Sequence, residues 1–346
     1  MCGANLHTHR RRAADKFAPV TILDQEIAEQ PAVIERLLDS AHDTIARVAR
    51  DTSPRFVVIA ARGSSDNAAR YAQHVLGRLC ALPVALATPS LHTLYGTPPR
   101  LHDALVIGIS QSGASPDVTA VVADGAAQGQ PTHAITNDAT SPMAQAAAHV
   151  IELGTGEERS VAATKTYTAS LAAVAALAAA INGDQALRDE LRGVPAAMAE
   201  QLATAADVDL DWERCAVIGR GANYATAFEA ALKVKELTGI AAEPYSPPDL
   251  MHGPIAVLGP DHGVLAFAPP GPAAPGVHEA VAEARRRGAP AVVAAPGADL
   301  DLVAMPEWLS PLGAVIPAQR LAAALAERRG IEVDRPFGLS KITRTT

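Results

Sequence analysis

The stretch VVIAARGSSDNAA, residues 57–69, reads as a buried strand, a turn and a helix that starts near Asp66. It recurs as AVIGRGANYATAF, residues 216–228, and both copies carry Arg-Gly directly after the strand. Four further apolar runs follow the two copies, at 104–110, 132–136, 263–268 and 291–295. Apolar strands without strict alternation, separated by helices, indicate parallel sheets covered on both faces. The sequence therefore predicts two α/β lobes of one architecture.

The length of 346 residues also favours more than one domain, because it is more than one compact hydrophobic core usually contains. We expect an N-terminal extension with a lead-in helix, a first lobe, a second lobe and a C-terminal tail, at residues 1–45, 46–190, 205–330 and 331–346. In the tail, Pro336 and Gly338 precede Lys341 and favour a shaped segment that folds back.

Composition narrows the class of protein. Hydrophobic residues make up 49% and charged residues 19%, which is typical of a soluble globular protein, and the net charge of -8 disfavours nucleic acid as a partner. The longest uncharged stretch, 166–183, has too short an apolar centre to cross a membrane and predicts a buried helix. Cys2, Cys80 and Cys215 form neither a metal-binding spacing nor a disulfide framework. We expect a cytoplasmic protein with no membrane partner.

Small polar residues crowd the end of the run at 104–110, in the sequence SQSGASP. Ser115 is placed to cap a helix, with Pro116 at its first position. The N-terminus of a helix favours an anion, and four side chains add neutral donors there: Ser110, Gln111, Ser112 and Ser115. Ser64 and Ser65, at the neighbouring strand-to-helix turn, could reach the same pocket. A phosphate monoester suits this cradle, although Ser and Gly also fill ordinary turns.

A second set of polar residues lies in EAALKVKELTGIAAEPYSPPDLMHGP, residues 229–254. Lys233 and Glu236 are three residues apart and share a helix face. They could be a surface ion pair of little energetic value. The Pro-rich segment that follows is expected to lack regular structure, and it carries His252 before a Gly-Pro turn. A carboxylate on a helix and a histidine on a rigid loop form a candidate acid–base pair.

Together, several motifs resemble the sugar isomerase (SIS) family with two tandem SIS domains. They are GSS, SQSGAS, ERSVAATKTYT, GRGANYATAFEAALKVKE, HGP and DRPFGLSKITRT, in that order along the chain. The chain is similar to the isomerase half of glucosamine-6-phosphate synthase, and more so to stand-alone isomerase-type glucosamine-6-phosphate deaminases. The resemblance implies flavodoxin-like three-layer lobes, a phosphosugar ligand in the first lobe, and no metal or cofactor.

The resemblance also implies which residues bind the sugar phosphate. Phosphate would be held by the serine turn and a neighbouring hydroxyl, namely Ser110, Gln111, Ser112, Ser115 and Ser65. Val161 and Ala162 would contact the sugar through their backbone. Three positions depart from the family pattern. This chain has Ala114 where the family has an acidic residue, Ser115 where it has threonine and Asp249 where it has glutamate.

Four residues receive catalytic roles by the same resemblance. Glu236 would move a proton between C1 and C2 of the sugar, and Lys233 would support the open-chain form. His252 would open the ring and reach into the partner subunit's site, which implies a homodimer. Lys341 would close the pocket from the tail.

The expected reaction is conversion of glucosamine 6-phosphate into fructose 6-phosphate and ammonia. The start Met-Cys-Gly is reminiscent of N-terminal-cysteine glutaminases, but too few residues precede the first lobe for such a domain, so we interpret Cys2 as a coincidence. Two alternatives stay open for the function. One is a fructosamine-6-phosphate deglycase or another amino-sugar-phosphate isomerase, and the other is a sensor that binds a sugar phosphate without turnover.

Overall fold

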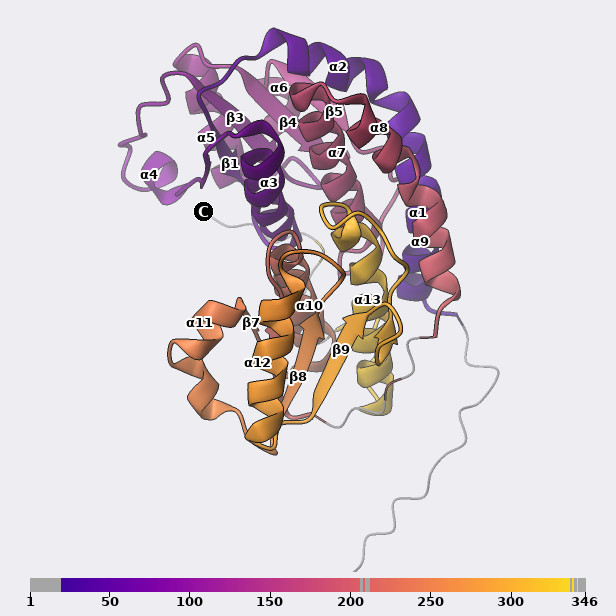
Figure 1. Cartoon of the computed structure of the whole chain (residues 1–346). Coiled ribbons are helices and arrows are strands. Elements are labelled where there is room, and N and C mark those ends of the chain that lie inside the picture. The colour runs from indigo at the N-terminus through magenta and orange to yellow at the C-terminus, as the bar shows by residue number, and fades with distance from the viewer. Residues whose placement is uncertain (1–19, 206–207, 209–211, 337, 339–340, 342–346) are drawn as a thin grey trace, which may run out of the picture.

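The computed structural model describes residues 20–205, 208, 212–336, 338 and 341. Figure 1 shows the two lobes one above the other, each with a sheet between helices. The N-terminal extension and Cys2 lie outside the described residues, as do eight positions of the tail.

Both lobes contain a five-stranded sheet in which all strand pairs are parallel. The first sheet has the order β2-β1-β3-β4-β5, with strands Phe56–Ala60 (β1), Val84–Leu86 (β2), Ala104–Ile109 (β3), Thr132–Thr136 (β4) and His149–Glu152 (β5). The second has the order β10-β9-β8-β6-β7, with strands Arg214–Ile218 (β6), Ala241–Tyr245 (β7), His262–Phe267 (β8), Ala291–Ala295 (β9) and Leu300–Asp301 (β10). In each lobe the first strand lies between the second and the third, which is the doubly wound, flavodoxin-like order. The prediction of two lobes of one architecture is confirmed.

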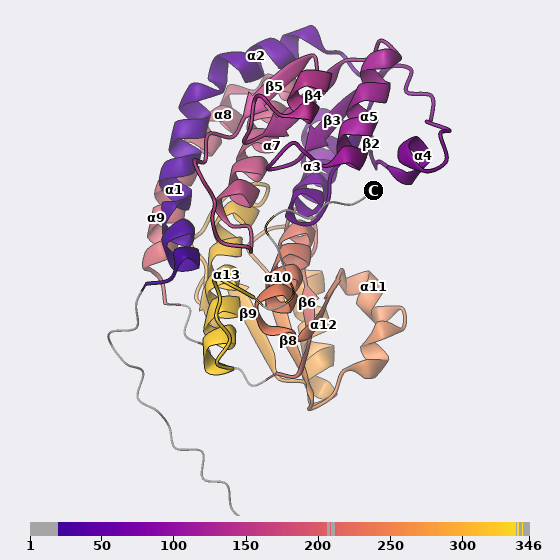
Figure 2. The same ribbon diagram turned by 180° about the vertical axis from the view of Figure 1, so that it is seen from behind.

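Helices cover both faces of each sheet. The first half of the chain contributes Ile22–Ser40 (α1), His42–Asp51 (α2), Ser64–Cys80 (α3), Ser90–Thr93 (α4), Pro116–Ala127 (α5), Pro142–Ala146 (α6) and Lys165–Asn182 (α7). The second half contributes Gln185–Arg192 (α8), Val194–Ala203 (α9), Asn223–Thr238 (α10), Pro247–Met251 (α11), a 3₁₀ turn at Pro254–Val257, Ala274–Arg286 (α12) and Ser310–Arg328 (α13). In Figure 2, α1, α2, α8 and α9 run along one edge, while α4 and α11 project on the other.

The central layer between the lobes holds one continuous apolar core. Helix α3 packs against α7 and α10, and α10 packs against α13. Two smaller cores lie on the outer faces of the sheets, beneath α5 in the first lobe and beneath α12 in the second. The uncharged stretch at 166–183 forms α7 and is buried almost throughout, as predicted. No helix in the described ranges has the length and apolar character of a membrane span.

The segment expected to lack regular structure is instead ordered, so that prediction was wrong. Residues 241–245 form β7, and Pro247–Met251 forms α11. Pro244 is tolerated because β7 is an edge strand, where a missing N–H interrupts no ladder. Pro247 and Pro248 stand in the first turn of α11, where a helix has unpaired N–H groups anyway. The first helix of the repeat also begins two residues earlier than expected, at Ser64.

Candidate active site

Three charged residues of α10 form a buried cluster in the layer between the lobes. Lys233 Nζ lies 3.4 Å from Glu229 Oε1 and also pairs with Glu236. Their spacings of four and three residues place all three on one helix face. The side chains of Glu229 and Lys233 are 0% and 1% exposed, whereas that of Glu236 is 24% exposed. Solvent, and therefore a ligand, can reach Glu236 alone of the three.

The first lobe supplies the remaining partners of this cluster. Glu229 accepts hydrogen bonds from Ser64 Oγ at 2.9 Å and from Asn67 Nδ2 at 2.7 Å, both at the start of α3. Burial raises the pKa of Glu229, and Lys233 and these donors counteract that effect. Burial alone would lower the pKa of Lys233, but Glu229 and Glu236 outweigh it and raise that pKa above its usual value. Lys233 is therefore held as a cation.

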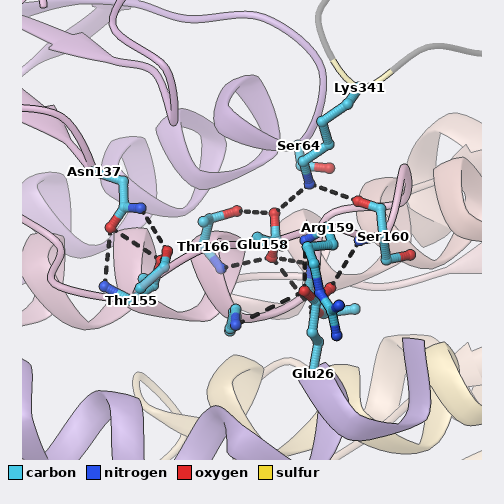
Figure 3. A network of polar contacts seen from close by, with 12 residues as sticks. Glu26, Ser64, Asn137, Thr155, Glu158, Arg159, Ser160, Thr166 and Lys341 are labelled. Carbon is cyan, nitrogen blue, oxygen red and sulfur yellow. Dashed lines mark hydrogen bonds and ion pairs between the residues drawn. The ribbon is translucent and has the colours of Figure 1, made fainter. Parts of the chain in front are cut away.

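The tail places Lys341 over a second buried carboxylate (Figure 3). Lys341 Nζ donates to Glu158 Oε2 at 2.7 Å and to the carbonyl oxygen of Ser160 at 2.7 Å. Glu158 also accepts hydrogen bonds from the backbone N–H groups of Thr164 and Thr166 and from the Thr166 hydroxyl. Burial opposes ionisation of Glu158, but Lys341 and these donors lower its pKa overall. Lys341 of the tail thus contacts the first lobe.

The loop that begins at Glu158 is also anchored to α1. Glu26 of α1 accepts hydrogen bonds from the N–H groups of Arg159 at 2.6 Å and Ser160 at 3.2 Å (Figure 3). This anchoring fixes the backbone around Val161, which is half-buried, and Ala162, which is fully buried. A fixed backbone is what positioning a sugar through main-chain groups requires.

The serine turn has the helix start that the sequence predicts. Ser115 is the residue before α5 and Pro116 its first residue, although the Ser115 side chain makes no capping hydrogen bond. Ser110 Oγ and Ser112 Oγ accept hydrogen bonds from the N–H groups that follow them in the turn. Gly113 has φ +58°, and a Cβ there would lie 2.0 Å from Ser141 Oγ, so no larger residue fits. The fold of the turn thus places several serine hydroxyl groups close together at the N-terminus of α5.

An ion pair links this turn to the turn after β1. Arg62 Nε and Nη2 lie 2.7 and 2.6 Å from Oδ2 of Asp117, and Asp117 belongs to the first turn of α5. The Asp117 side chain is buried, whereas that of Arg62 is 53% exposed. A positively charged group is therefore fixed beside the serine turn and remains open to solvent.

His252 stands apart from the α10 cluster. It follows α11 directly, is exposed, and contacts the Pro248 carbonyl oxygen through Nδ1 at 2.7 Å. No described contact joins it to Lys233 or Glu236, so its crossing to a partner subunit stays a prediction. Within the described part of the chain, no group of three or more His, Cys, Asp and Glu side chains could hold a metal ion.

Sequence reasoning missed three residues that shape this site: Arg62, Glu158 and Glu229. A signal existed for Glu229, which precedes Lys233 by one helical turn on the same face. Arg62 was noticed only as part of the repeat. Glu158 opens the motif ERSVAATKTYT, but no local pattern indicates its role, because its cationic partner lies 183 residues away in the sequence.

Comparisons with known proteins agree with this architecture. The model of the SIS domain family matches residues 52–180 and 210–299. A glutamine–fructose-6-phosphate aminotransferase (isomerizing) of Gloeobacter violaceus is 33% identical over 353 residues, which cover 92% of this chain and 57% of that protein. This chain thus spans little more than half the length of such curated relatives.

Solved structures share the fold over nearly the whole chain. A candidate phosphosugar isomerase from Silicibacter pomeroyi has a TM-score of 0.82 and 34% identity, covering 91% of this chain and 100% of that one. A glucosamine-6-phosphate deaminase from Thermotoga maritima has a TM-score of 0.79 at 20% identity, covering 94% and 100%. Since the family model matches in both lobes, the chain belongs to the SIS domain family and carries its SIS segments in tandem.

Proposed function

We propose that this protein is a phosphosugar isomerase whose reaction is the deamination of glucosamine 6-phosphate. The observation that carries the proposal is the α10 cluster, in which a solvent-accessible carboxylate, Glu236, is paired with a buried ammonium group, Lys233. An aldose–ketose isomerisation needs one base that moves a proton between adjacent carbons. It also needs a fixed positive charge near the oxygen on which negative charge develops.

The serine turn supports a phosphate end for the substrate. Ser110, Gln111, Ser112 and Ser115 surround the N-terminus of α5, where backbone dipoles favour an anion. Neutral hydroxyl donors can hold a phosphate there without a lysine in contact. Ser65, in the first turn of α3, is the neighbouring hydroxyl that would complete this cradle.

The proposed reaction proceeds on the open-chain sugar, after His252 has assisted ring opening. Glu236 takes the proton from C2 and returns it to C1, and a second proton passes from the C2 nitrogen to the C1 oxygen. The 2-amino aldose thereby becomes the C2 imine of the ketose. Water then adds at C2, and the C2–N bond breaks to release ammonia and fructose 6-phosphate. The buried Lys233 stabilises the oxyanion that forms during proton transfer through its charge, without contacting the sugar. Lys341 covers the sugar together with the anchored loop at 158–164.

The test follows both products from glucosamine 6-phosphate, with no glutamine present. We expect ammonia and fructose 6-phosphate to appear in equal amounts, and Glu236→Gln to abolish their formation. Glu200→Gln, at an exposed position on α9, is the matched control and should keep full turnover.

Two outcomes would contradict the proposal. Undiminished turnover by Glu236→Gln would remove the proton-transfer role from this residue. Absence of ammonia, together with thermal stabilisation by the same sugar phosphate, would reduce the protein to a phosphosugar binder or an enzyme with another amine leaving group.

A further inference from the structure

A cavity lies on the outer side of the first lobe, away from the site described above. It has a volume of about 370 Å³ and is bounded by α2, α7, α8 and the end of α1. Figures 1 and 2 show α1, α2 and α8 along one edge of the molecule, with α7 on their inner side. The volume falls within the range of small-molecule sites, about 300–1,000 Å³. None of its lining residues belongs to the α10 cluster, the serine turn or the anchored loop.

The floor of this cavity is made largely of alanine. Ala46 and Ala49 come from α2, and Ala176, Ala179 and Ala180 come from α7. Their methyl groups leave open the space that larger side chains would fill in a close-packed helix interface. The side of the cavity that these alanines line is therefore apolar and built into the facing helices.

The rim of the cavity is cationic. Arg50, Arg188 and Arg192 contribute to the lining, which contains no acidic residue. Arg50 makes no hydrogen bond or ion pair with any described residue. Arg192 pairs with Asp189 at 2.6 Å, but both side chains are about 60% exposed, so this pair holds the guanidinium only weakly. Arg188 donates to the neutral side chain of Gln185 at 3.3 Å, so its charge is not compensated there. Arg50 and Arg188 thus present uncompensated positive charge to an external anion.

We propose that this cavity binds an amphiphilic carboxylate. The apolar body of the ligand lies against the alanine floor, where burial of hydrocarbon is favourable. Its carboxylate pairs with the guanidinium groups, whose planar donors match a carboxylate better than an ammonium group would. A neutral ligand leaves the cationic rim unpaired, and a cationic ligand is repelled by it.

The position of the cavity suits an effector rather than a substrate. Helix α7 lines it with Ala179 and, about 13 residues earlier, donates the Thr166 N–H to Glu158. At the rise of an α-helix this separation is roughly 20 Å. Helix α1 likewise contributes Leu38 to the cavity and Glu26 to the anchored loop. Both helices therefore join the cavity to the loop around the proposed sugar site.

The test is calorimetric titration of the full chain with sodium decanoate, in the absence of any sugar phosphate. We expect saturable binding at one site per chain. The double variant Arg50→Ala/Arg188→Ala and the cavity-filling variant Ala180→Met should each weaken binding at least tenfold. Arg47→Ala, on the same helix but outside the lining, should bind like the parent. Circular dichroism and thermal unfolding establish that each variant is folded.

Three results would overturn the proposal. Equal binding of decanol or decyltrimethylammonium would show a nonspecific apolar surface without charge recognition. Unchanged decanoate affinity in the rim and cavity-filling variants would place the binding elsewhere. Absence of decanoate binding, with a shift of Arg50→Ala/Arg188→Ala to a smaller oligomer in size-exclusion chromatography, would assign the cavity to contact between copies of the chain.

Discussion

At the scale of single residues, Asp117 raises an electrostatic problem for the proposed phosphate site. Its carboxylate is buried in the first turn of α5, next to the hydroxyl groups that would hold a dianion. A negative charge at that position repels phosphate unless it is neutralised. Arg62 neutralises it from the turn after β1. The Arg-Gly of the first repeat copy therefore has an electrostatic role in the first lobe.

This pairing predicts a specific pattern of affinities. Arg62→Ala should raise the KM for glucosamine 6-phosphate about tenfold or more, because it leaves the Asp117 charge uncompensated. Asp117→Asn in the same chain should reverse most of that loss, because it removes the repelling charge. Steady-state kinetics of the two single variants and the double variant measure this coupling.

The pair Arg287–Glu283 at the C-terminal end of α12, with a partly exposed guanidinium, provides the control for that cycle. Removing it should leave KM unchanged, because exposed ion pairs remote from a site contribute little. If the double variant Arg62→Ala/Asp117→Asn bound substrate no better than Arg62→Ala, Arg62 would act by contact with the ligand and not by charge compensation.

The residue scale also separates what the sequence could predict from what it could not. Lys233 and Glu236 were predictable as a pair, because helical spacing alone brings them together. The serine turn was predictable because a strand, a turn and a capping residue are local features. The contacts of Glu158 with Lys341 and of Glu229 with Ser64 join residues more than 160 positions apart. The contact of Lys341 with Glu158 depends on the path of the tail, and that of Ser64 with Glu229 on the packing of the two lobes.

At the scale of elements, the strands that the sequence predicted are the central ones. β1, β3 and β4 of the first sheet, and β6, β8 and β9 of the second, were recognised from apolar runs. The four that were missed, β2, β5, β7 and β10, are the sheet edges. An edge strand has a neighbour on one side only, so it can be short, carry polar residues and even contain Pro244. Its sequence therefore lacks the continuous apolar run of a central strand.

Strand β4 contains a buried histidine that makes stability depend on pH. His133 is 0% exposed, and neither of its ring nitrogens has a hydrogen-bond partner among the described residues. Burial, with a smaller contribution from His149 on β5, lowers the pKa of His133 to about 3. Between pH 6.5 and 3 the unfolded chain binds a proton here that the folded chain does not. Stability is therefore present in full above pH 6.5 and is lost as the pH falls.

Replacing this side chain should flatten that dependence. When the pH falls from 8 to 5, the free energy of unfolding should decrease less in His133→Leu than in the parent, by about 2 kcal/mol. The difference arises because uptake of one proton changes this free energy by about 1.4 kcal/mol per pH unit. Urea denaturation at the two pH values measures the difference. His102→Gln, at an exposed position, is the control and should keep the parent slope. An equal slope in His133→Leu would show that another group causes the acid sensitivity.

At the scale of the whole molecule, exposed apolar side chains near His252 support the prediction that it meets a partner subunit. Met251 and Val257, on either side of His252 in the sequence, are 50% and 57% exposed. Leu94 and Tyr95, just after α4, are 67% and 70% exposed. Figure 1 shows α4 and α11 projecting on the same side of the molecule. Large apolar side chains gathered on one side are typical of an interface. The tandem repeat predicted the lobes, but a repeat within one chain says nothing about this surface.

The crossing of His252 can be decided by mixing two inactive variants. His252→Ala and Glu236→Gln should each lose turnover as separate proteins. In a twofold dimer that shares residues across the interface, a mixed dimer has one site with both natural residues. Unfolding and refolding an equal mixture should then restore about a quarter of the parent activity, since half the dimers are mixed and each has one of two sites intact. If His252 acts within its own chain, every site lacks one residue and the mixture stays inactive. Recovery on mixing would therefore place the complete site at a subunit interface, with α11 of one chain facing α10 of its partner.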